Sequence, residues 1–293
     1  MALLTERQPP RGIPLDVGWG VRRIVAANPT PMTYHGTNTY LIPQDDGIAV
    51  LDPGPPDDEV HVDAVVAATG QSIVRILISH THHDHLGAAG ALKARTGAPI
   101  CAFVQSAEPG FTPDIGLRDG DRIGGLTAVH TPGHAIDHLC YAMPGGVLFT
   151  GDHVMGWSST VVSPPRGNLL IYIASLRKLL DRTDIAYLPG HGPVVHEPHA
   201  LIKSFLDRRM MREREISKAM SAPQTLKEIA DRVYSKPNET LQRAAERNLL
   251  AHLLKLEAEG KAAREGDIWS LTPGACCSQV ESLGVAHAAK SNS

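Results

Sequence analysis

One stretch of nine residues constrains this chain more than any other. The sequence SHTHHDHLG, residues 79–87, places four histidines and one aspartate in six consecutive positions from His80 to His85. Imidazole nitrogens and carboxylate oxygens are ligands of zinc, and also of iron or manganese. The competing interpretation is a solvated polar loop, because short motifs do arise by chance. The choice between a metal site and a polar loop decides which function the rest of the sequence supports.

The position of this stretch favours the metal site. Residues 73–79 (IVRILIS) form a nearly continuous apolar run, which is typical of a buried strand. Residues 84–97 then have a helical pattern, which we expect to begin with Asp84 as N-cap and to end at Gly97. Proteins of the α/β class present binding groups at such a junction, at the carboxyl end of a strand.

The spacing within the motif predicts two neighbouring ions. Residues two apart on an extended segment point the same way, so His80 and His82 can bind one ion. Asp84 and His85 follow at the helix start and can reach a second ion. His83 points away from both, and we expect it to be a bystander.

Three later segments repeat the same arrangement of apolar strand, glycine-rich turn and ligand-type side chain. They are HTPGHAIDHL (130–139) with His134, LFTGDHVMG (148–156) with Asp152, and YLPGHGPVV (187–195) with His191. A single histidine in a turn is usually an ordinary polar side chain in contact with solvent. Four such segments, each at a predicted strand end, are not plausibly accidental and favour the metal site over the polar loop.

The order of the elements predicts the architecture. Short apolar runs alternate with helical patterns over the first two-thirds of the chain, which indicates an α/β layered domain with sheet in the middle. Beyond about residue 200, three charged helical patterns and a short alternating piece outline a winged helix-turn-helix. We therefore predict a catalytic domain at 1–205, a winged-helix-like domain at 206–273 and a loosely held tail at 274–293.

Composition and charge exclude several classes of protein. The formal net charge of −3 argues against a protein that holds nucleic acid mainly by bulk charge. No apolar run is long enough to cross a bilayer, and Glu6 and Arg7 stand where a signal peptide needs apolar residues. The cysteines form no CxxC pair, so we expect Cys101 and Cys140 to be small core residues in a cytoplasmic protein.

The motifs HxHxDH, TPGH, TGD and PGHG together resemble the metallo-β-lactamase superfamily. The resemblance covers about residues 15 to 200 and includes GTNTYLI (36–42) and VLDPGP (50–55). It implies an αββα sandwich, here followed by the small C-terminal winged-helix domain. It also implies a ligand set in which one metal is held by His80, His82 and His134, the second by Asp84, His85 and His191, with Asp152 bridging them.

The resemblance leaves several polar residues with open roles. We expect Asp52 to support one of the ligand loops. Asp137 and His138 could orient His134, or they could be ordinary polar residues. His153 and Tyr172 could contact substrate or transfer a proton, or they could be a surface residue and a packing residue.

Two divalent ions define the expected chemistry. When they share a water, they lower its pKa enough to give hydroxide at neutral pH, which attacks a carbonyl or phosphorus. The metals stabilise the oxyanion that forms, and Asp84 is the predicted catalytic residue that holds the nucleophile and accepts its proton. We therefore predict a metal-dependent hydrolase with two Zn²⁺ ions, iron and manganese being the alternatives.

Two stretches in the C-terminal part of the chain restrict the expected class of substrate. Residues 191–216 and 247–271 are similar to the beta-lactamase-like protein 2 family, whose animal members act as endoribonucleases on single-stranded RNA. Similar two-domain proteins hydrolyse thioesters, which makes a thioester hydrolase the alternative. A β-lactamase is less favoured without a signal peptide, and a single-iron sulfur dioxygenase is less favoured because His85 and His191 are both present.

The winged helix is a weak candidate for binding duplex DNA. Residues 205–275 contain thirteen Lys and Arg against eleven Asp and Glu. The one basic cluster consists of Arg208, Arg209, Arg212 and Arg214. We therefore expect this domain to pack on the sandwich and border the active site, rather than to make the protein a DNA-binding regulator. The expected partner is a small-molecule substrate or single-stranded RNA, with no membrane, and a homodimer is left open.

Overall fold

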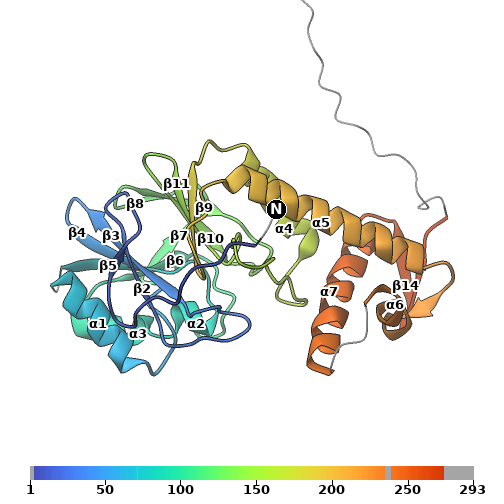
Figure 1. Cartoon of the computed structure of the whole chain (residues 1–293), viewed down its shortest axis with the longest axis horizontal. Helices are drawn as coiled ribbons and strands as arrows, with labels where there is room; N and C mark the ends of the chain where they lie inside the picture. Colours follow the sequence, from blue (N-terminus) through green and yellow to red (C-terminus); the bar gives the residue numbers. More distant parts are fainter. Residues whose placement is uncertain (1–2, 71, 235–238, 274–293) are drawn as a thin grey trace, which may run out of the picture.

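A computed structural model describes residues 3–70, 72–234 and 239–273 of the chain (Figure 1). Its first sheet has seven strands in sequence order, antiparallel from β1 to β4 and parallel from β4 to β7. The strands are β1 (Leu15–Asp16), β2 (Arg22–Val25), β3 (Asn38–Gln44), β4 (Gly47–Leu51), β5 (Ile73–Leu77), β6 (Ile100–Phe103) and β7 (Ile115–Leu117). Helix α1 (Glu59–Thr69) connects β4 to β5, and helices α2 (His83–Leu86) and α3 (Ala89–Thr96) connect β5 to β6.

The second sheet has five strands in the order β12-β11-β10-β9-β8. They are β8 (Arg122–Ile123), β9 (Leu126–His130), β10 (Leu139–Met143), β11 (Val147–Gly151) and β12 (Ala186–Pro189). The turn at 144–146 joins β10 and β11 as the hairpin that the sequence predicted. Helix α4 (Leu169–Leu180) connects β11 to the parallel strand β12.

Three apolar clusters show that the domain has four layers. Tyr40 and Leu51 of the first sheet pack with Tyr141 and Phe149 of the second in a core between the sheets. A second cluster joins the outer face of the first sheet to α1 and α3, and a third joins the second sheet to α4 and to α5 (Pro198–Ala219). The predicted αββα sandwich is therefore confirmed.

The helix predicted over 84–97 is wrong in two respects. It is divided into α2 and α3, because the backbone N–H of Ala88 donates to Gly54 O (3.0 Å) instead of continuing the helix. The N-cap of α2 is His82, and Asp84 lies inside the first turn. Gly87 at the break cannot carry a side chain, since a β-carbon there would come within 2.3 Å of Pro56.

The C-terminal region forms the predicted winged helix. It contains α6 (Leu226–Val233), α7 (Glu239–Ala258) and a small sheet in the order β13-β15-β14. The strands are β13 (Gln224–Thr225), β14 (Ala262–Glu265) and β15 (Ile268–Leu271). The capping box of Thr225 and Glu228 fixes the start of α6.

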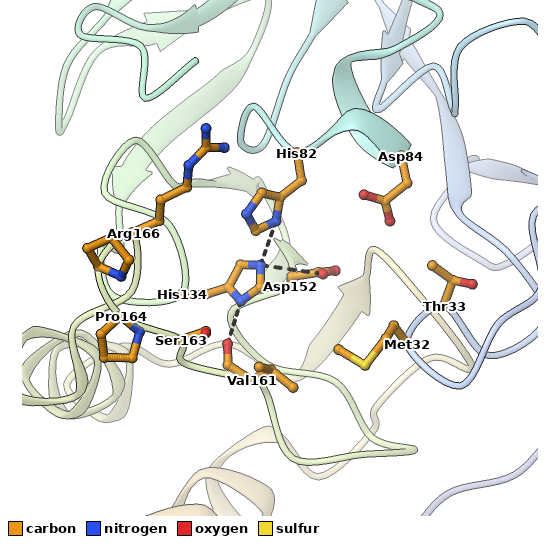
Figure 2. A pocket seen from close by; sticks show the side chains of 11 residues that line it. Met32, Thr33, His82, Asp84, His134, Asp152, Val161, Ser163, Pro164 and Arg166 are labelled. Atoms are coloured by element: carbon orange, nitrogen blue, oxygen red, sulfur yellow. Dashed lines mark hydrogen bonds and ion pairs between the residues drawn. The ribbon is translucent and has the colours of Figure 1, made fainter. Parts of the chain in front are cut away.

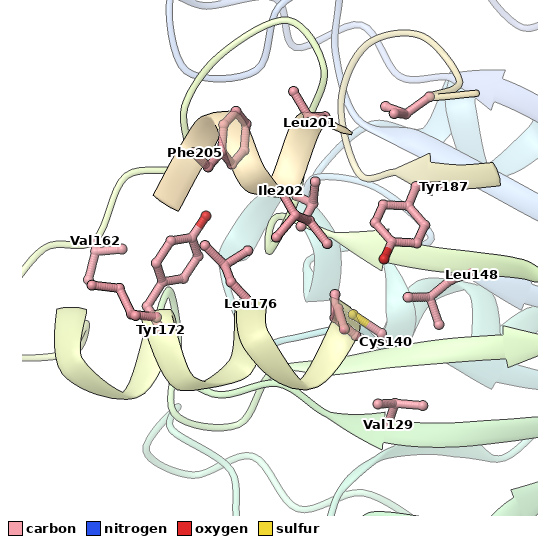
Figure 3. Packing of buried hydrophobic residues seen from close by; sticks show 14 of the residues in the cluster. Val129, Cys140, Leu148, Val162, Tyr172, Leu176, Tyr187, Leu201, Ile202 and Phe205 are labelled. Atoms are coloured by element: carbon pink, nitrogen blue, oxygen red, sulfur yellow. The ribbon is translucent and has the colours of Figure 1, made fainter. Parts of the chain in front are cut away.

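Helix α5 connects the sandwich to the winged helix and belongs to both. Leu201, Ile202 and Phe205 in its first half pack on α4, as Figure 3 shows, whereas Ile216 in its second half packs with α6 and α7. The predicted domain boundary after residue 205 falls inside this helix, and the division into domains stays a prediction. The predicted tail at 274–293 lies outside the described residues.

Two further expectations concern the buried cysteines and the membrane. Cys101 and Cys140 are buried and free, as expected for core residues. Among the helices of the described part of the chain, none is long and apolar enough to cross a membrane.

Candidate metal centre

Loops at the ends of four strands bring the predicted ligands together. His80 and His82 follow β5, and Asp84 and His85 lie in α2 directly after them. The other three ligands follow β9, β11 and β12, and all seven fall into three overlapping groups whose ligand atoms lie within 4.8 Å of one another: His80, His82 and His134; His80, His85 and Asp152; Asp84, His85 and His191. His83 is exposed and belongs to none of these groups.

The first group is a cluster of three histidine nitrogens. His82 Nδ1 lies 2.9 Å from His80 Nε2 and 3.0 Å from His134 Nε2. Nitrogens bound to one tetrahedral zinc ion at ~2.0 Å are about 3.3 Å apart, so the observed spacing is close to that of a ligand set. Burial, followed by the neighbouring histidines, lowers the pKa of His82 to about 4, which keeps its ring neutral and able to bind a cation.

The second group combines one carboxylate with two histidines. Asp84 Oδ2 lies 3.1 Å from His191 Nε2 and 3.4 Å from His85 Nε2. Burial opposes ionisation of Asp84, but His85 and His191 hold the pKa of this carboxyl down at about 2. Burial likewise opposes protonation of His85, but Asp84, Asp152 and Asp52 raise its pKa well above the usual range. This group therefore attracts positive charge.

Asp152 faces both groups at once. Its Oδ1 lies 3.4 Å from both His85 Nε2 and His191 Nε2, whereas its Oδ2 lies 3.6 Å from His134 Nε2. The Nε2 atoms of His85 and His191 and the Oδ1 atom of Asp152 are buried and have no hydrogen-bond partner. Buried polar atoms in proteins normally have hydrogen-bond partners. Three buried polar atoms that lack one and lie close together therefore fit a cation bound between them.

The protons of four histidines are fixed on the outer side of the centre. The Nδ1–H group donates to Ser79 Oγ in His80 (3.0 Å), to Asp52 Oδ2 in His85 (2.8 Å), to Val161 O in His134 (2.7 Å) and to Gly36 O in His191 (3.1 Å). Each bond directs Nε2 inward, and in the neutral ring its lone pair is then free, which is the tautomer that a metal requires. The ring orientations are therefore fixed by the protein itself.

As expected, Asp52 supports the loop that carries the predicted ligands. Its Oδ1 accepts from Ser79 N (2.7 Å), and its Oδ2 accepts from Ser79 Oγ (2.7 Å) and His85 Nδ1 (2.8 Å). It adopts a left-handed backbone conformation with φ of 52°. One buried carboxylate thus positions His85 directly and His80 through Ser79.

Asp137 and His138 have roles other than orienting His134. Asp137 Oδ2 accepts from Thr81 Oγ1 (2.6 Å) and Ala107 N (2.9 Å), which anchors the loop between His80 and His82. His138 Nε2 accepts from Asp152 N (3.2 Å). The partner of His134 is instead the carbonyl oxygen of Val161, which the sequence could not reveal because every residue has one.

His153 and Tyr172 are core residues. Both are fully buried, and the Tyr172 hydroxyl donates to His153 O (3.0 Å). Neither lines the cavity at the centre, so the structure gives them packing roles. The loop that follows His153 supports the candidate centre, because Thr160 Oγ1 donates to the backbone oxygen of Asp152 (2.9 Å), the residue that faces both groups.

A cavity of about 370 Å³ opens onto the centre (Figure 2). His82, Asp84, His134 and Asp152 line its inner end, and Met32, Thr33 and Val161 line the wall with Ser163, Pro164, Pro165 and Arg166. Arg166 forms an ion pair with Glu108 (3.3 Å), and 57% of its side chain is exposed. The mouth thus combines one cation with apolar surface.

Comparisons with known proteins agree with this geometry. A model of the metallo-beta-lactamase superfamily matches residues 32–191, and a model of the beta-lactamase associated winged helix domain matches residues 225–269. A relative named beta-lactamase-like protein 2 homolog from Drosophila melanogaster is 33% identical, over 82% of this chain and 89% of its own length.

Two further matches bear on the activity and on the fold. A protein from Aspergillus chevalieri named atrochrysone carboxyl ACP thioesterase is 32% identical, over 84% of this chain and 83% of its own. The crystal structure of a beta-lactamase domain protein from Burkholderia ambifaria covers 91% of this chain and 96% of its own, with a TM-score of 0.78 and 22% identity. At that identity the structural match supports the fold alone.

Proposed function

Because this chain belongs to the metallo-beta-lactamase superfamily of hydrolases and carries the winged helix associated with it, we propose that it is a binuclear metal hydrolase that cleaves phosphodiester bonds of single-stranded RNA. The observation that carries the binuclear part is Asp152, whose two oxygens face two different ligand groups. A carboxylate so placed can bridge two ions, which a single-ion site would not need.

The ligand chemistry fits two divalent cations. His80, His82 and His134 would hold the first, Asp84, His85 and His191 the second, and Asp152 both. Histidine and carboxylate ligands suit Zn²⁺, and they also accept iron or manganese. When bound, such a pair lowers the pKa of water to give a nucleophile at neutral pH and stabilises negative charge on the attacked group.

The residues of this chain supply positioning and proton transfer. Asp84 borders the cavity and remains ionised, because its pKa is held at about 2, so it can accept a proton from the nucleophile. Arg166 at the mouth can hold a phosphate next to the scissile one, since a guanidinium pairs well with phosphate oxygens. The similarity to beta-lactamase-like protein 2 homologues over most of the chain supports the choice of RNA.

A thioester hydrolase is the second candidate. The relative from Aspergillus chevalieri is named as a thioesterase and is nearly as similar as the first relative. Met32 and Val161 present exposed apolar surface in the cavity, which could contact an acyl chain. The two candidates share the metal centre and differ in what the mouth of the cavity binds.

One pair of assays separates the candidates. The zinc-loaded chain is incubated with a fluorescently labelled single-stranded 12-mer RNA and, separately, with acyl-coenzyme A thioesters. We expect RNA cleavage that Arg166→Gln weakens mainly through KM, with the exposed Arg177→Gln on α4 as the matched control. Thioester cleavage without RNA cleavage overturns the RNA assignment, and inactivity on both with two metals bound overturns the proposal.

A further inference from the structure

A second cavity, of about 420 Å³, lies between α5 and α7, away from the metal centre. Three of the four arginines of the basic cluster line it, namely Arg208, Arg209 and Arg212. The fourth, Arg214, is exposed on the same helix and is not among the lining residues. The basic cluster therefore has an inward side that the hydrolase mechanism does not use.

Arg209 is a buried cation without a carboxylate partner among the described residues. The residue is 8% exposed, and its Nη2 donates to the backbone oxygen of Thr160 (2.5 Å). Its guanidinium also lies 5.8 Å from the ring centre of Tyr172. A neutral carbonyl and an aromatic ring do not balance a full charge taken out of water, so an anion next to Arg209 would be strongly stabilised.

Arg212 adds a second guanidinium whose position is fixed. It lies 4.6 Å from the ring centre of Tyr234 and 2.8 Å from Glu215. Glu215 is the one carboxylate among the described lining residues, which include three arginines. Since Glu215 pairs with Arg212, Arg209 is the buried guanidinium of the described lining that has no carboxylate beside it.

His252 on α7 completes the cavity from the opposite side. Its side chain is fully buried, yet neither of its ring nitrogens has a hydrogen-bond partner. Burial, followed by Arg209, Lys255 and Arg212, lowers the pKa of His252 to about 3, so the ring is neutral near pH 7 and has one N–H to donate. An unpartnered buried donor that lines a cavity indicates a missing acceptor.

We propose that this cavity binds the phosphate group of a nucleotide-sized ligand, held by the guanidinium groups of Arg209 and Arg212 and by the ring of His252. A phosphate monoester carries close to two negative charges near pH 7 and offers three acceptor oxygens, which suit the donors of the two guanidinium groups and the imidazole. The volume lies within the usual range of small-molecule sites. The proposal does not depend on the reaction at the metal centre.

The test uses the full chain after chelation and dialysis, because phosphate would also bind to metals at the other site. Inorganic phosphate, adenosine monophosphate and a single-stranded 12-mer RNA are titrated separately by calorimetry in phosphate-free buffer. We expect adenosine monophosphate to bind, and to bind at least tenfold more weakly to Arg212→Gln and to His252→Leu. The matched control Arg214→Gln removes the same charge from the same helix and should bind as the unmodified chain does.

The three probes separate the sources of the phosphate group. Tighter binding of the monophosphate than of the 12-mer assigns a free nucleotide, and the reverse order assigns a nucleic-acid strand. Circular dichroism checks the fold of each variant, and the comparison of Arg212→Gln with Arg214→Gln carries the test if His252→Leu does not fold. Failure of all three probes to bind at millimolar concentration, or equal weakening by Arg212→Gln and Arg214→Gln, overturns the proposal.

Discussion

Replacing Asp52 by asparagine removes the carboxylate but keeps the size of the side chain. The two side chains have nearly the same size, and asparagine tolerates the left-handed backbone conformation that Asp52 adopts with φ of 52°. The carboxylate accepts three hydrogen bonds, one from His85 and two from Ser79. An amide has a single oxygen, so it cannot accept all three.

The magnitude follows from the tautomer of His85. An amide NH₂ placed opposite His85 Nδ1 favours the ring form that has its proton on Nε2, and that form has no lone pair directed at Asp84 and Asp152. Loss of such a supporting contact typically lowers metal affinity 10- to 100-fold, which is about 1.4 to 2.7 kcal/mol. Loss of a hydrogen bond to a charged group should also lower the free energy of unfolding by about 1.5 to 3 kcal/mol.

The assay is competition for Zn²⁺ against a chromophoric chelator, with urea unfolding of the metal-free chain alongside. The control is Asp63→Asn, an exposed carboxylate that should leave the zinc affinity unchanged. The expected loss is confined to one of the two zinc equivalents, because Asp52 contacts His85 of the second group directly and the first group only through Ser79. Two zinc affinities within twofold of the unmodified chain would refute this account of Asp52.

Three further results are expected. Gly190→Ala should lower zinc content and hydrolysis at least tenfold, because the added β-carbon would come within 2.7 Å of His85 and 2.8 Å of Asp152. Gly90 in α3 has open space around it, so Gly90→Ala should instead raise the free energy of unfolding by about 1 kcal/mol. Removal of zinc from the loaded chain should lower stability by about 4 kcal/mol at a thousandfold excess over Kd, seen as a lower Tm by calorimetry, and an unchanged Tm would contradict the metal centre. Burial lowers the pKa of His61 to about 4, so between pH 6.5 and 4 the unfolded chain binds more protons than the folded chain, and stability falls as the pH is lowered. Urea unfolding at several pH values should show that the free energy of unfolding depends less steeply on pH in His61→Gln, by up to about 1.4 kcal/mol per pH unit.

The sequence predicted which ligand-type side chains come together, because their positions follow a local rule. Each comes directly after an apolar strand and within a turn, and the ends of neighbouring strands meet at one edge of a sheet. His80 and His134 lie far apart in the chain, yet both could be placed from their own surroundings. The layers were predictable for the same reason, since strand and helix periodicities are local properties.

The contacts that hold the ligands could not be predicted in the same way. Val161 supports His134 through a backbone carbonyl, a group that carries no signal in the sequence. The division between α2 and α3 depends on Gly54, more than thirty residues before Ala88. Asp137 and His138 are polar residues near a ligand, but only the fold decides that they support Thr81 and Asp152 instead of His134.

Helix α5, which leads into the winged helix, also supports the candidate metal centre. Leu201 and Phe205 bury its first half against α4, which fixes where the next turns of the helix lie. Arg209 then donates to Thr160 O, and the hydroxyl of Thr160 donates to the carbonyl of Asp152, the residue that faces both ligand groups. Arg209, which lines the second cavity, therefore contacts the loop that supports Asp152 in the candidate metal centre. Because Arg209 is shared, a phosphate bound between α5 and α7 would act on the same hydrogen-bonded chain that positions Asp152. The two sites can be occupied independently only if Arg209 keeps its bond to Thr160 when the anion binds, which its remaining N–H donors allow.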